Sequence, residues 1–124
     1  MKQSDAPNRR KEGNYNEQLA RDFLVKKGYA IVHEQWKFGK VGEIDLICKD
    51  GETLVFVEVK ARANYDFGKP EDAVTPGKRM QIRRVARGYL YVNKVKFAEC
   101  RFDVVAVDYV SGKPEIRHWV HAFD

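Results

Sequence analysis

Carboxylates and a lysine interrupt two strongly apolar segments in the middle of the chain. The stretches GEIDLIC and TLVFVEVKAR place Asp45, Glu58 and Lys60 among Ile, Leu, Val and Phe. A charged side chain within a sheet is unfavourable unless it is solvated, paired or bound to an ion. Mg²⁺ accepts one or two carboxylates, a carbonyl oxygen and several waters as ligands. The pattern therefore predicts a divalent-metal site formed by Asp45, Glu58 and the carbonyl of Val59.

The Asp-Gly pair at 50–51 joins these two segments and is a strong signal for a tight hairpin turn. With this pair as the turn, Asp45 lies opposite Phe56, and Glu43 lies opposite Glu58. Asp45 and Glu58 are then diagonal neighbours, whose like charges require a cation between them. Side chains alternate between the faces of a strand, so we expect two different faces. The acidic face holds Glu43, Asp45, Phe56, Glu58 and Lys60. The main core face holds Ile44, Leu46, Val55, Val57 and Val59.

Lys60 follows Glu58 by two residues and therefore lies on the same face of the strand. Beside a metal, its ammonium group would orient or deprotonate a water molecule, or stabilise the charge that develops on a phosphate under attack. The alternative is a solvated Glu-x-Lys pattern on an exposed strand, which carries no chemistry. The apolar flanks and the nearby Asp45 favour the metal site.

The order of elements predicts a single α/β domain over residues 13–124, preceded by a flexible basic arm over residues 1–12. Apolar periodicity predicts one helix over 12–27 and a second that Thr75 caps and Pro76 begins. The core-facing stripe of the second helix consists of Ile82, Val85, Ala86, Tyr89 and Leu90. Strands are expected over 29–36, 42–49, 53–62, 101–110 and 115–123, the last being either a strand or a C-terminal extension. This αβββαββ order predicts a mixed central sheet flanked by helices.

The composition is that of a globular protein with a basic surface. The 124 residues are 44% hydrophobic, and the net charge of +5, with a pI near 9.2, suits a polyanionic partner such as nucleic acid. No apolar run approaches the roughly 20 residues that span a membrane, and no signal-peptide pattern is present. We therefore expect a cytoplasmic location and no membrane partner. Cys48 and Cys100 lack metal-type spacing and are expected to be packing residues.

Two charged residues near the helix starts have both a functional and a structural interpretation. Glu17 lies in the first turn of the first helix, where it either leans toward the sheet edge or complements the helix dipole. Lys78 lies at the N-terminal end of the second helix, where a cation has the unfavourable sign for the dipole. A phosphate or acidic partner for Lys78 and a solvated lysine are both consistent with this position.

Basic residues and histidines farther along the chain are weaker candidates. Arg83, Arg84 and Arg87 point away from the apolar stripe of the second helix, so they form either a surface that follows a nucleic-acid backbone or a soluble face. His118 and His121 would ligate a metal only if their segment were helical.

Four blocks of the sequence together resemble a known family. The blocks GEIDLI, FVEVKAR, AVTPGKRMQIRRVARGYL and RFDVVAV resemble, in this order, the YraN-like family of bacterial proteins, which belongs to the restriction-endonuclease-like, or PD-(D/E)XK, nuclease superfamily. The resemblance implies a restriction-endonuclease-like α/β core with Asp45, Glu58, Lys60 and Glu17 as its catalytic set. Glu43 lies outside that set and is expected to support the metal ligands from beside them.

The resemblance also implies an activity. It favours a metal-dependent endonuclease that uses Mg²⁺ or Mn²⁺ to hydrolyse DNA, contacted through Lys78, Arg62, Arg83, Arg84 and Arg87. A similarity to archaeal Holliday-junction resolvases suggests branched or otherwise structured DNA and a homodimer. The chain departs from the family pattern where Asn16 replaces a Gly and where Lys37 or Lys40 replaces an Arg. The alternative is a non-catalytic nucleic-acid-binding or assembly module that retains the fold.

Overall fold

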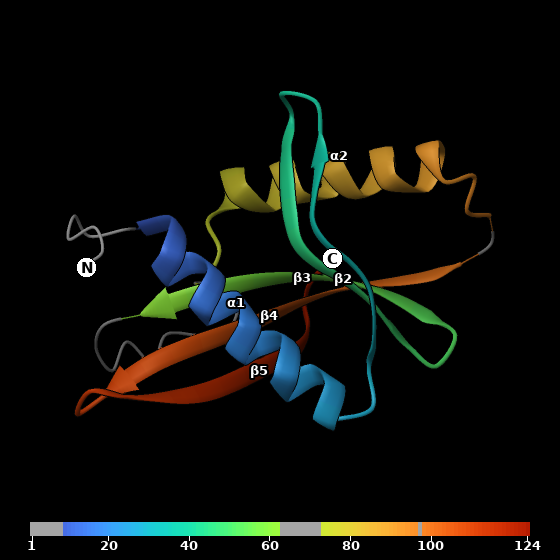
Figure 1. Cartoon of the computed structure of the whole chain (residues 1–124). Coiled ribbons are helices and arrows are strands. Elements are labelled where there is room, and N and C mark those ends of the chain that lie inside the picture. Colours follow the sequence, from blue (N-terminus) through green and yellow to red (C-terminus); the bar gives the residue numbers. More distant parts are fainter. Residues whose placement is uncertain (1–8, 63–72, 97) are drawn as a thin grey trace, which may run out of the picture.

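The computed structural model describes the chain except for residues 1–8, 63–72 and 97 (Figure 1). Its elements follow the order αβββαββ. The helices are α1 (Arg9–Lys26) and α2 (Pro76–Val92). The strands are β1 (Ala30–Phe38), β2 (Gly42–Asp50), β3 (Thr53–Arg62), β4 (Glu99–Val110) and β5 (Lys113–Phe123). The element order predicted from the sequence is confirmed, and the last segment is a strand.

The five strands form one mixed sheet in the order β1-β2-β3-β4-β5. Neighbours are antiparallel except β3 and β4, which are parallel and are connected through α2. The two helices cover opposite faces of the sheet (Figure 1). Ala20 and Leu24 of α1 pack with Leu46 and Val55 on one face, and a separate cluster packs beneath α2 on the other. The predicted α/β class with a mixed central sheet flanked by helices is therefore confirmed.

The β2–β3 hairpin has a different register from the one expected. Asp50 pairs with Thr53, and Leu46 pairs with Val57, so Gly51 and Glu52 form the turn. Gly51 has a φ of 62°, which glycine adopts without steric cost. The register is displaced by two residues from the predicted one, and an even displacement leaves every β3 side chain on its expected face.

The β3 part of the predicted core face is confirmed, since its three valines pack in the cluster beneath α1, but the opposite face is packed as well and is not purely acidic. Phe56, expected beside the acids, is buried in the cluster beneath α2. Ile44 belongs to that same cluster, whereas Leu46 belongs to the cluster beneath α1. Residues two apart on a regular strand share a face. The strand β2 therefore changes the face it presents at Asp45.

The neighbouring strand β1 makes the same change at Gln35. Glu34 accepts a hydrogen bond from Arg21 of α1, whereas the ring of Trp36 packs edge-on against Tyr89 of α2. Gln35 has a φ of 51°, in the left-handed region that few residues other than glycine adopt. This local twist carries the β1–β2 hairpin across to α2, beside which it projects in Figure 1.

Both helices have recognisable local determinants. The Thr75 side chain caps α2 by accepting the Lys78 N–H at 3.2 Å, with Pro76 as the first residue. The predicted α2 stripe is confirmed: Ile82, Val85, Ala86 and Tyr89 are buried, and Leu90 is partly buried against them. Since α1 begins at Arg9, residues 9–12 of the predicted arm are helical, and the rest of that arm lies outside the described residues. Neither described helix is long and apolar enough to cross a membrane.

Two smaller expectations meet mixed outcomes. Cys48 is fully buried in the cluster beneath α1, as expected, but Cys100 is exposed and is not a core residue. His118 and His121 lie on a strand, so the helical spacing that a metal pair would need is absent. His118 instead contacts Asp103 at 2.7 Å, and the His121 N–H donates to the same carboxylate at 3.0 Å.

Candidate active site

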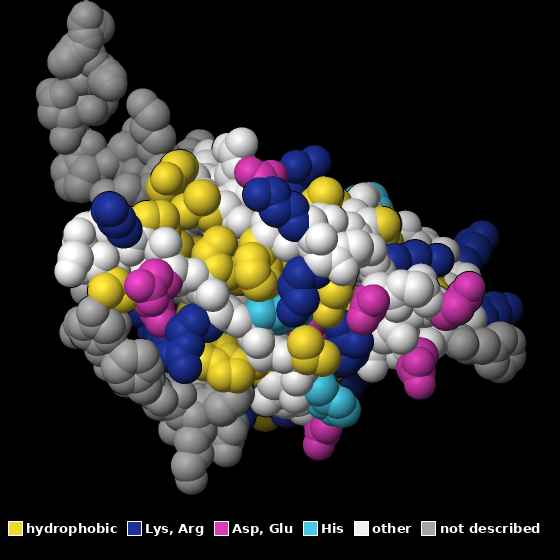
Figure 2. Space-filling view, turned by 90° about the horizontal axis from the view of Figure 1, so that it is seen from below, with side chains coloured by type: hydrophobic (Ala, Val, Ile, Leu, Met, Phe, Trp, Pro, Cys, Tyr) yellow, Lys and Arg dark blue, Asp and Glu magenta, His cyan; other side chains and the backbone are white. Residues whose placement is uncertain are grey.

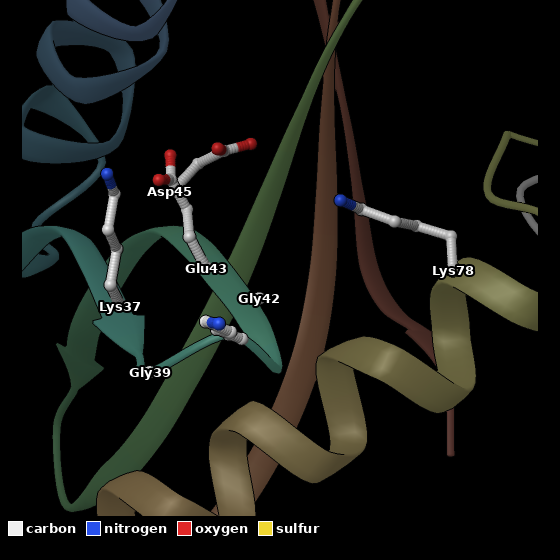
Figure 3. A pocket seen from close by; sticks show the side chains of 7 residues that line it. Lys37, Gly39, Gly42, Glu43, Asp45 and Lys78 are labelled. Atoms are coloured by element: carbon white, nitrogen blue, oxygen red, sulfur yellow. The ribbon is translucent and has the colours of Figure 1, made fainter.

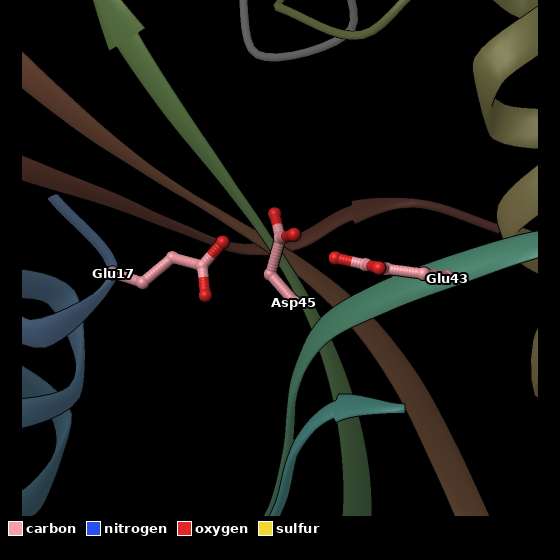
Figure 4. Close-up of side chains that lie close together, drawn as sticks. All are labelled: Glu17, Glu43 and Asp45. Carbon is pink, nitrogen blue, oxygen red and sulfur yellow. The ribbon is translucent and has the colours of Figure 1, made fainter. Parts of the chain in front are cut away.

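Three carboxylates from α1 and β2 converge at one point beside the sheet. Oxygen atoms of Glu17, Glu43 and Asp45 all lie within 4.8 Å of one another. Figure 4 shows Glu17 reaching from α1 toward Asp45, with Glu43 approaching from the opposite side. All three side chains are half-buried. The cluster lies where β2 changes face, so the twist of this strand brings acids from two elements together.

Asp45 is anchored to β3 through the main chain. Its Oδ2 accepts the Val59 N–H at 2.8 Å, just beyond the last paired residues of the β2–β3 ladder, Leu46 and Val57. The carboxylate therefore occupies the place of a main-chain acceptor. The contact recorded for Val59 is through its amide, whereas the sequence suggested its carbonyl as a metal ligand.

Glu17 is held in place by a residue that sequence reasoning did not identify. The Gln35 side-chain amide donates to Glu17 Oε1 at 2.8 Å and to Asn14 Oδ1 at 3.1 Å. The adjacent Asn16 is buried and accepts a hydrogen bond from the Tyr109 hydroxyl of β4 at 2.6 Å. These contacts fix the rotation of α1 relative to the sheet. No sequence pattern indicates the left-handed conformation that directs Gln35 toward α1.

Glu58 approaches the cluster from β3. Its side chain is 12% exposed, and its Oε2 lies 3.8 Å from the Nζ of Lys78 on α2. The charge of Asp45 acts on Glu58, as does that of Lys60, the exposed residue two positions farther along β3. The structure thus brings Glu58 and Lys78 into contact, although they are 20 residues apart in the sequence and no local pattern pairs them.

The acids hold their protons more tightly than isolated carboxyl groups do. Burial, followed by the charge of Asp45, raises the pKa of Glu58 to about 8. Burial and then the same charge raise the pKa of Glu17 to about 7. Burial also raises the pKa of Asp45, despite the hydrogen bond from Val59. The nearby cations, such as Lys78, therefore do not compensate the negative charge, and a further cation would bind favourably.

Two of the acids, Glu43 and Asp45, open into a pocket of about 380 Å³ with a basic rim. Figure 3 shows Lys37 and Lys78 on either side of Glu43 and Asp45. The lining residues are Lys37, Gly39, Lys40, Gly42, Glu43, Asp45 and Lys78. Lys37 and Lys40, which stand where the resemblance expects an arginine, therefore both face the acidic cluster. A site with carboxylates at its centre and ammonium groups around it suits a phosphate group bound through a metal.

The predicted DNA-contacting arginines differ in their surroundings. Arg62 pairs with Asp108 through two hydrogen bonds of 2.7 and 2.9 Å, and its side chain is only 10% exposed. The Nε of Arg83 donates to the main-chain oxygen of Asp124 at 2.6 Å. Arg84 and Arg87, by contrast, are exposed. The face turned away from α2 mixes hydrophobic, basic and acidic side chains (Figure 2), so basic residues form no continuous surface there.

The fold and this site define an α/β protein whose acidic centre lies between a helix and a twisted mixed sheet. The chain belongs to the uncharacterised protein family UPF0102, whose sequence pattern matches residues 16–107. The resemblance to the YraN-like family is thereby confirmed.

Several members of this family are similar to the chain over nearly their whole length. A UPF0102 protein of Caldicellulosiruptor saccharolyticus is 44% identical over 109 residues, which cover 88% of this chain and 91% of that protein. UPF0102 proteins of Syntrophomonas wolfei and Natranaerobius thermophilus are each 41% identical, over 114 and 118 residues. These matches cover 92% and 94% of this chain and 98% and 99% of those proteins.

Proposed function

We propose that this protein is a metal-dependent endonuclease that hydrolyses phosphodiester bonds in DNA. The observation that carries the proposal is the convergence of carboxylates on Asp45, which together with Glu43 lines a pocket with a lysine rim. Acids whose pKa values are raised by burial and by one another would gain from a cation. The surrounding lysines would in turn gain from an anion. A phosphodiester bound through a divalent metal satisfies both requirements.

The donor set fits Mg²⁺ or Mn²⁺. Glu17, Glu43 and Asp45 offer hard carboxylate oxygens from two separate elements, and no histidine or cysteine joins them among the described residues. Such oxygen-only sites suit Mg²⁺ and Mn²⁺ rather than Zn²⁺. Asp45 belongs both to this cluster and to the Asp45–Glu58 pair predicted from the sequence, and is thus the central ligand in either arrangement.

The roles of the chain's own residues follow from their positions. When bound, the metal would supply Lewis-acid activation of the phosphate and lower the pKa of a water molecule. Asp45 and Glu58 would hold the cation, and Glu17 and Glu43, whose oxygens lie beside those of Asp45, would bind it directly or through water molecules. Lys60, exposed beyond Glu58, would orient the attacking water and stabilise the charge of the transition state.

The lysines of the rim would hold the substrate. Lys37, Lys40 and Lys78 line the same pocket as the acids and would neutralise the phosphate oxygens. Lys78 belongs to the lysine rim and also contacts an acid, because its Nζ lies 3.8 Å from Glu58. A phosphate in the pocket would therefore share this ammonium group with Glu58. Branched or otherwise structured DNA as the substrate, and a homodimer as the active form, remain part of the proposal.

Cleavage of a panel of linear, flapped and four-way-junction DNAs in Mn²⁺ tests the function. We expect Asp45→Asn and Lys60→Ala to lose at least about 100-fold in rate, since losing even the supports of a metal ligand costs 10–100-fold. Glu115→Gln, at an exposed position of β5, serves as the matched control and should cut like the wild type. If no DNA is cut, or if Asp45→Asn cuts normally, the enzyme proposal fails and the non-catalytic module is favoured.

A further inference from the structure

A second pocket lies beside the acidic one, on the other side of the β1–β2 hairpin tip. Its volume is about 360 Å³. Its lining residues are Phe38, Val41, Arg84, Arg87, Gly88 and Tyr91. We propose that it binds one unpaired nucleotide of the strand whose phosphate occupies the acidic pocket. This inference rests on the proposed function and specifies its substrate class: DNA with a single-stranded segment next to the scissile phosphate.

The floor of this pocket is apolar and rigidly built. Phe38 lies directly against Gly88 of α2, where an added Cβ would come within 2.6 Å of the phenyl ring. Trp36 stacks on Phe38 with ring centroids 5.9 Å apart and an interplanar angle of 11°. Glycine at position 88 therefore allows a ring of the hairpin to lie on the helix backbone. The result is a flat apolar surface of the kind that a nucleobase covers well.

The rim of the pocket carries uncompensated positive charge. Arg84 and Arg87 are exposed, and neither has a hydrogen-bond or ion-pair partner among the residues that the structure describes. The sequence of α2, PGKRMQIRRVARGYLYV, contains no acidic residue that could neutralise them. Arg83, on the same helix, is already engaged by the main-chain oxygen of Asp124. The pocket therefore favours an anionic ligand.

Tyr91 completes the pocket with an aromatic ring in solvent. Its exposed fraction is 83%, the largest among the exposed large hydrophobic residues of the described chain. An aromatic ring beside two arginines, above an apolar floor, provides a stacking partner for a base and cations for its phosphate. In a blunt duplex each base is already stacked on its neighbours and paired. Only an unpaired nucleotide can insert its base between Tyr91 and the floor.

The two pockets flank the turn between β1 and β2, whose residues alternate between them. Gly39, Lys40 and Gly42 line the acidic pocket, and Phe38 and Val41 line the second one. The amide of Gln81 fixes this tip to α2 by donating to the Val41 carbonyl at 2.8 Å. One nucleic-acid strand can thus occupy both pockets by passing over this turn, which Gln81 already holds in place.

Lys78 and Arg84 place basic groups of the same helix at the two pockets. An acidic peptide would also neutralise Arg84 and Arg87. The position next to a lysine-rimmed acidic site favours a nucleotide over a peptide.

Fluorescence anisotropy with the full chain and no metal tests the pocket. The probes are a labelled 12-nucleotide oligothymidine, a labelled blunt DNA duplex and a labelled oligoglutamate peptide. We expect Tyr91→Ala to weaken oligothymidine binding about tenfold, within the range for loss of one stacked base. Binding of the blunt duplex should change less than twofold, and Tyr91→Phe should retain the wild-type affinity.

Matched variants separate stacking from general effects. Tyr15→Ala, which removes an exposed tyrosine from α1, should leave both affinities unchanged. Arg84→Gln should weaken both DNA probes, since it removes a phosphate contact. The proposal is overturned if Tyr91→Ala binds oligothymidine like the wild type, if it weakens both DNA probes equally, or if oligoglutamate competes better than oligothymidine.

The failure of this inference can be distinguished from the failure of the proposed function. Asp45→Asn should lose cleavage, yet its oligothymidine binding should still be weakened by Tyr91→Ala, as in the wild type. If the wild type cuts no DNA but its oligothymidine binding still depends on Tyr91, the nuclease proposal fails and the nucleotide pocket stands. If the wild type cuts tailed and blunt DNA equally well and Tyr91→Ala does the same, the pocket proposal fails and the nuclease stands.

Discussion

Two aspartates inside the same sheet, Asp45 and Asp103, have opposite electrostatic surroundings. Asp103 is fully buried, and hydrogen-bond partners surround its carboxylate: Arg101 binds both of its oxygens, at 2.9 and 3.1 Å, and His118 Nε2 lies at 2.7 Å. Burial acts to raise its pKa, but the hydrogen bonds from His118 and Arg101 hold that pKa below its ordinary value. The pKa of Asp45 is instead raised, because burial outweighs the hydrogen bond from the Val59 N–H, and the charge of Glu43 adds to this effect.

The difference distinguishes a cluster that is satisfied within the protein from the proposed metal site. Around Asp103, the Tyr29 hydroxyl accepts from Arg101 at 2.6 Å, and His118 also contacts Lys27 of the α1 terminus at 2.8 Å. These contacts join the C-terminal end of α1 to β4 and β5, and they satisfy the carboxylate within the protein. Asp45 has one main-chain donor and several acidic neighbours. A proton or a bound cation would relieve this negative charge, which is consistent with the proposed metal site.

The largest expected effect is on stability, and it tests the comparison of Asp103 with Asp45 directly. Asp103→Asn removes one partner of a buried charged network, which should lower the free energy of unfolding by about 3 kcal/mol or more. Asp45→Asn, at pH 8 and without metal, should instead raise it by about 1 kcal/mol, as relief of a functional site often does. Urea unfolding followed by circular dichroism measures both. Equal destabilisation by the two substitutions would contradict the assignment.

A second prediction concerns the dependence of stability on pH. Glu58 and Glu17 have folded pKa values of about 8 and about 7, above their ordinary value of 4.5. Between the ordinary pKa and the raised one, the folded state therefore binds more protons than the unfolded state. The contribution of Glu58 and Glu17 to stability is thus complete at low pH and falls as the pH rises from about 5 to 8. Glu58→Gln should flatten this decline, which urea unfolding across the pH range would measure.

Mn²⁺ should remove the same decline, since it replaces the protons. At 100 times its dissociation constant it should stabilise the wild type by about 2.7 kcal/mol. Calorimetric titration at pH 7 in two buffers of different ionisation enthalpy should show proton release on binding. Asp45→Asn should bind no Mn²⁺, and Asp22→Asn, at an exposed position of α1, should bind it normally. Binding without proton release would contradict the raised pKa values.

The smallest effect sharpens the role of Gln35. Gln35→Gly retains the left-handed backbone at low cost but removes the amide that holds Glu17. We expect Mn²⁺ affinity to fall about tenfold, the lower end of the range for a residue that supports a metal ligand. Gln35→Asn, with a shorter amide, should lose the contact to Glu17 as well. Calorimetry measures both variants, and an unchanged affinity in Gln35→Gly would show that the Gln35–Glu17 hydrogen bond does not organise the site.

Much of the fold could be predicted because its determinants are local. The Thr75 cap, the apolar stripe of α2 and the alternation of Val and Phe in β3 each depend on residues a few positions apart. The hairpin turn could be predicted to within one residue: the sequence favoured Asp50-Gly51, and the structure uses Gly51 and Glu52. Both turns place glycine where a positive φ is available. The tertiary pairing decided between them.

The composition of the acidic centre depends on contacts that no local pattern encodes. Asp45, Glu58 and Lys60 stand out in the sequence because charges are rare inside apolar strands, and that rarity is a local property. The proximity of Glu17 to Asp45 depends on how α1 rotates against β4 and on the left-handed Gln35. The inclusion of Glu43 depends on the change of face at Asp45. The types of the chemical groups were thus determined by the sequence alone, whereas only the tertiary structure decided which groups meet, because strand twist and helix docking act over residues far apart in the chain.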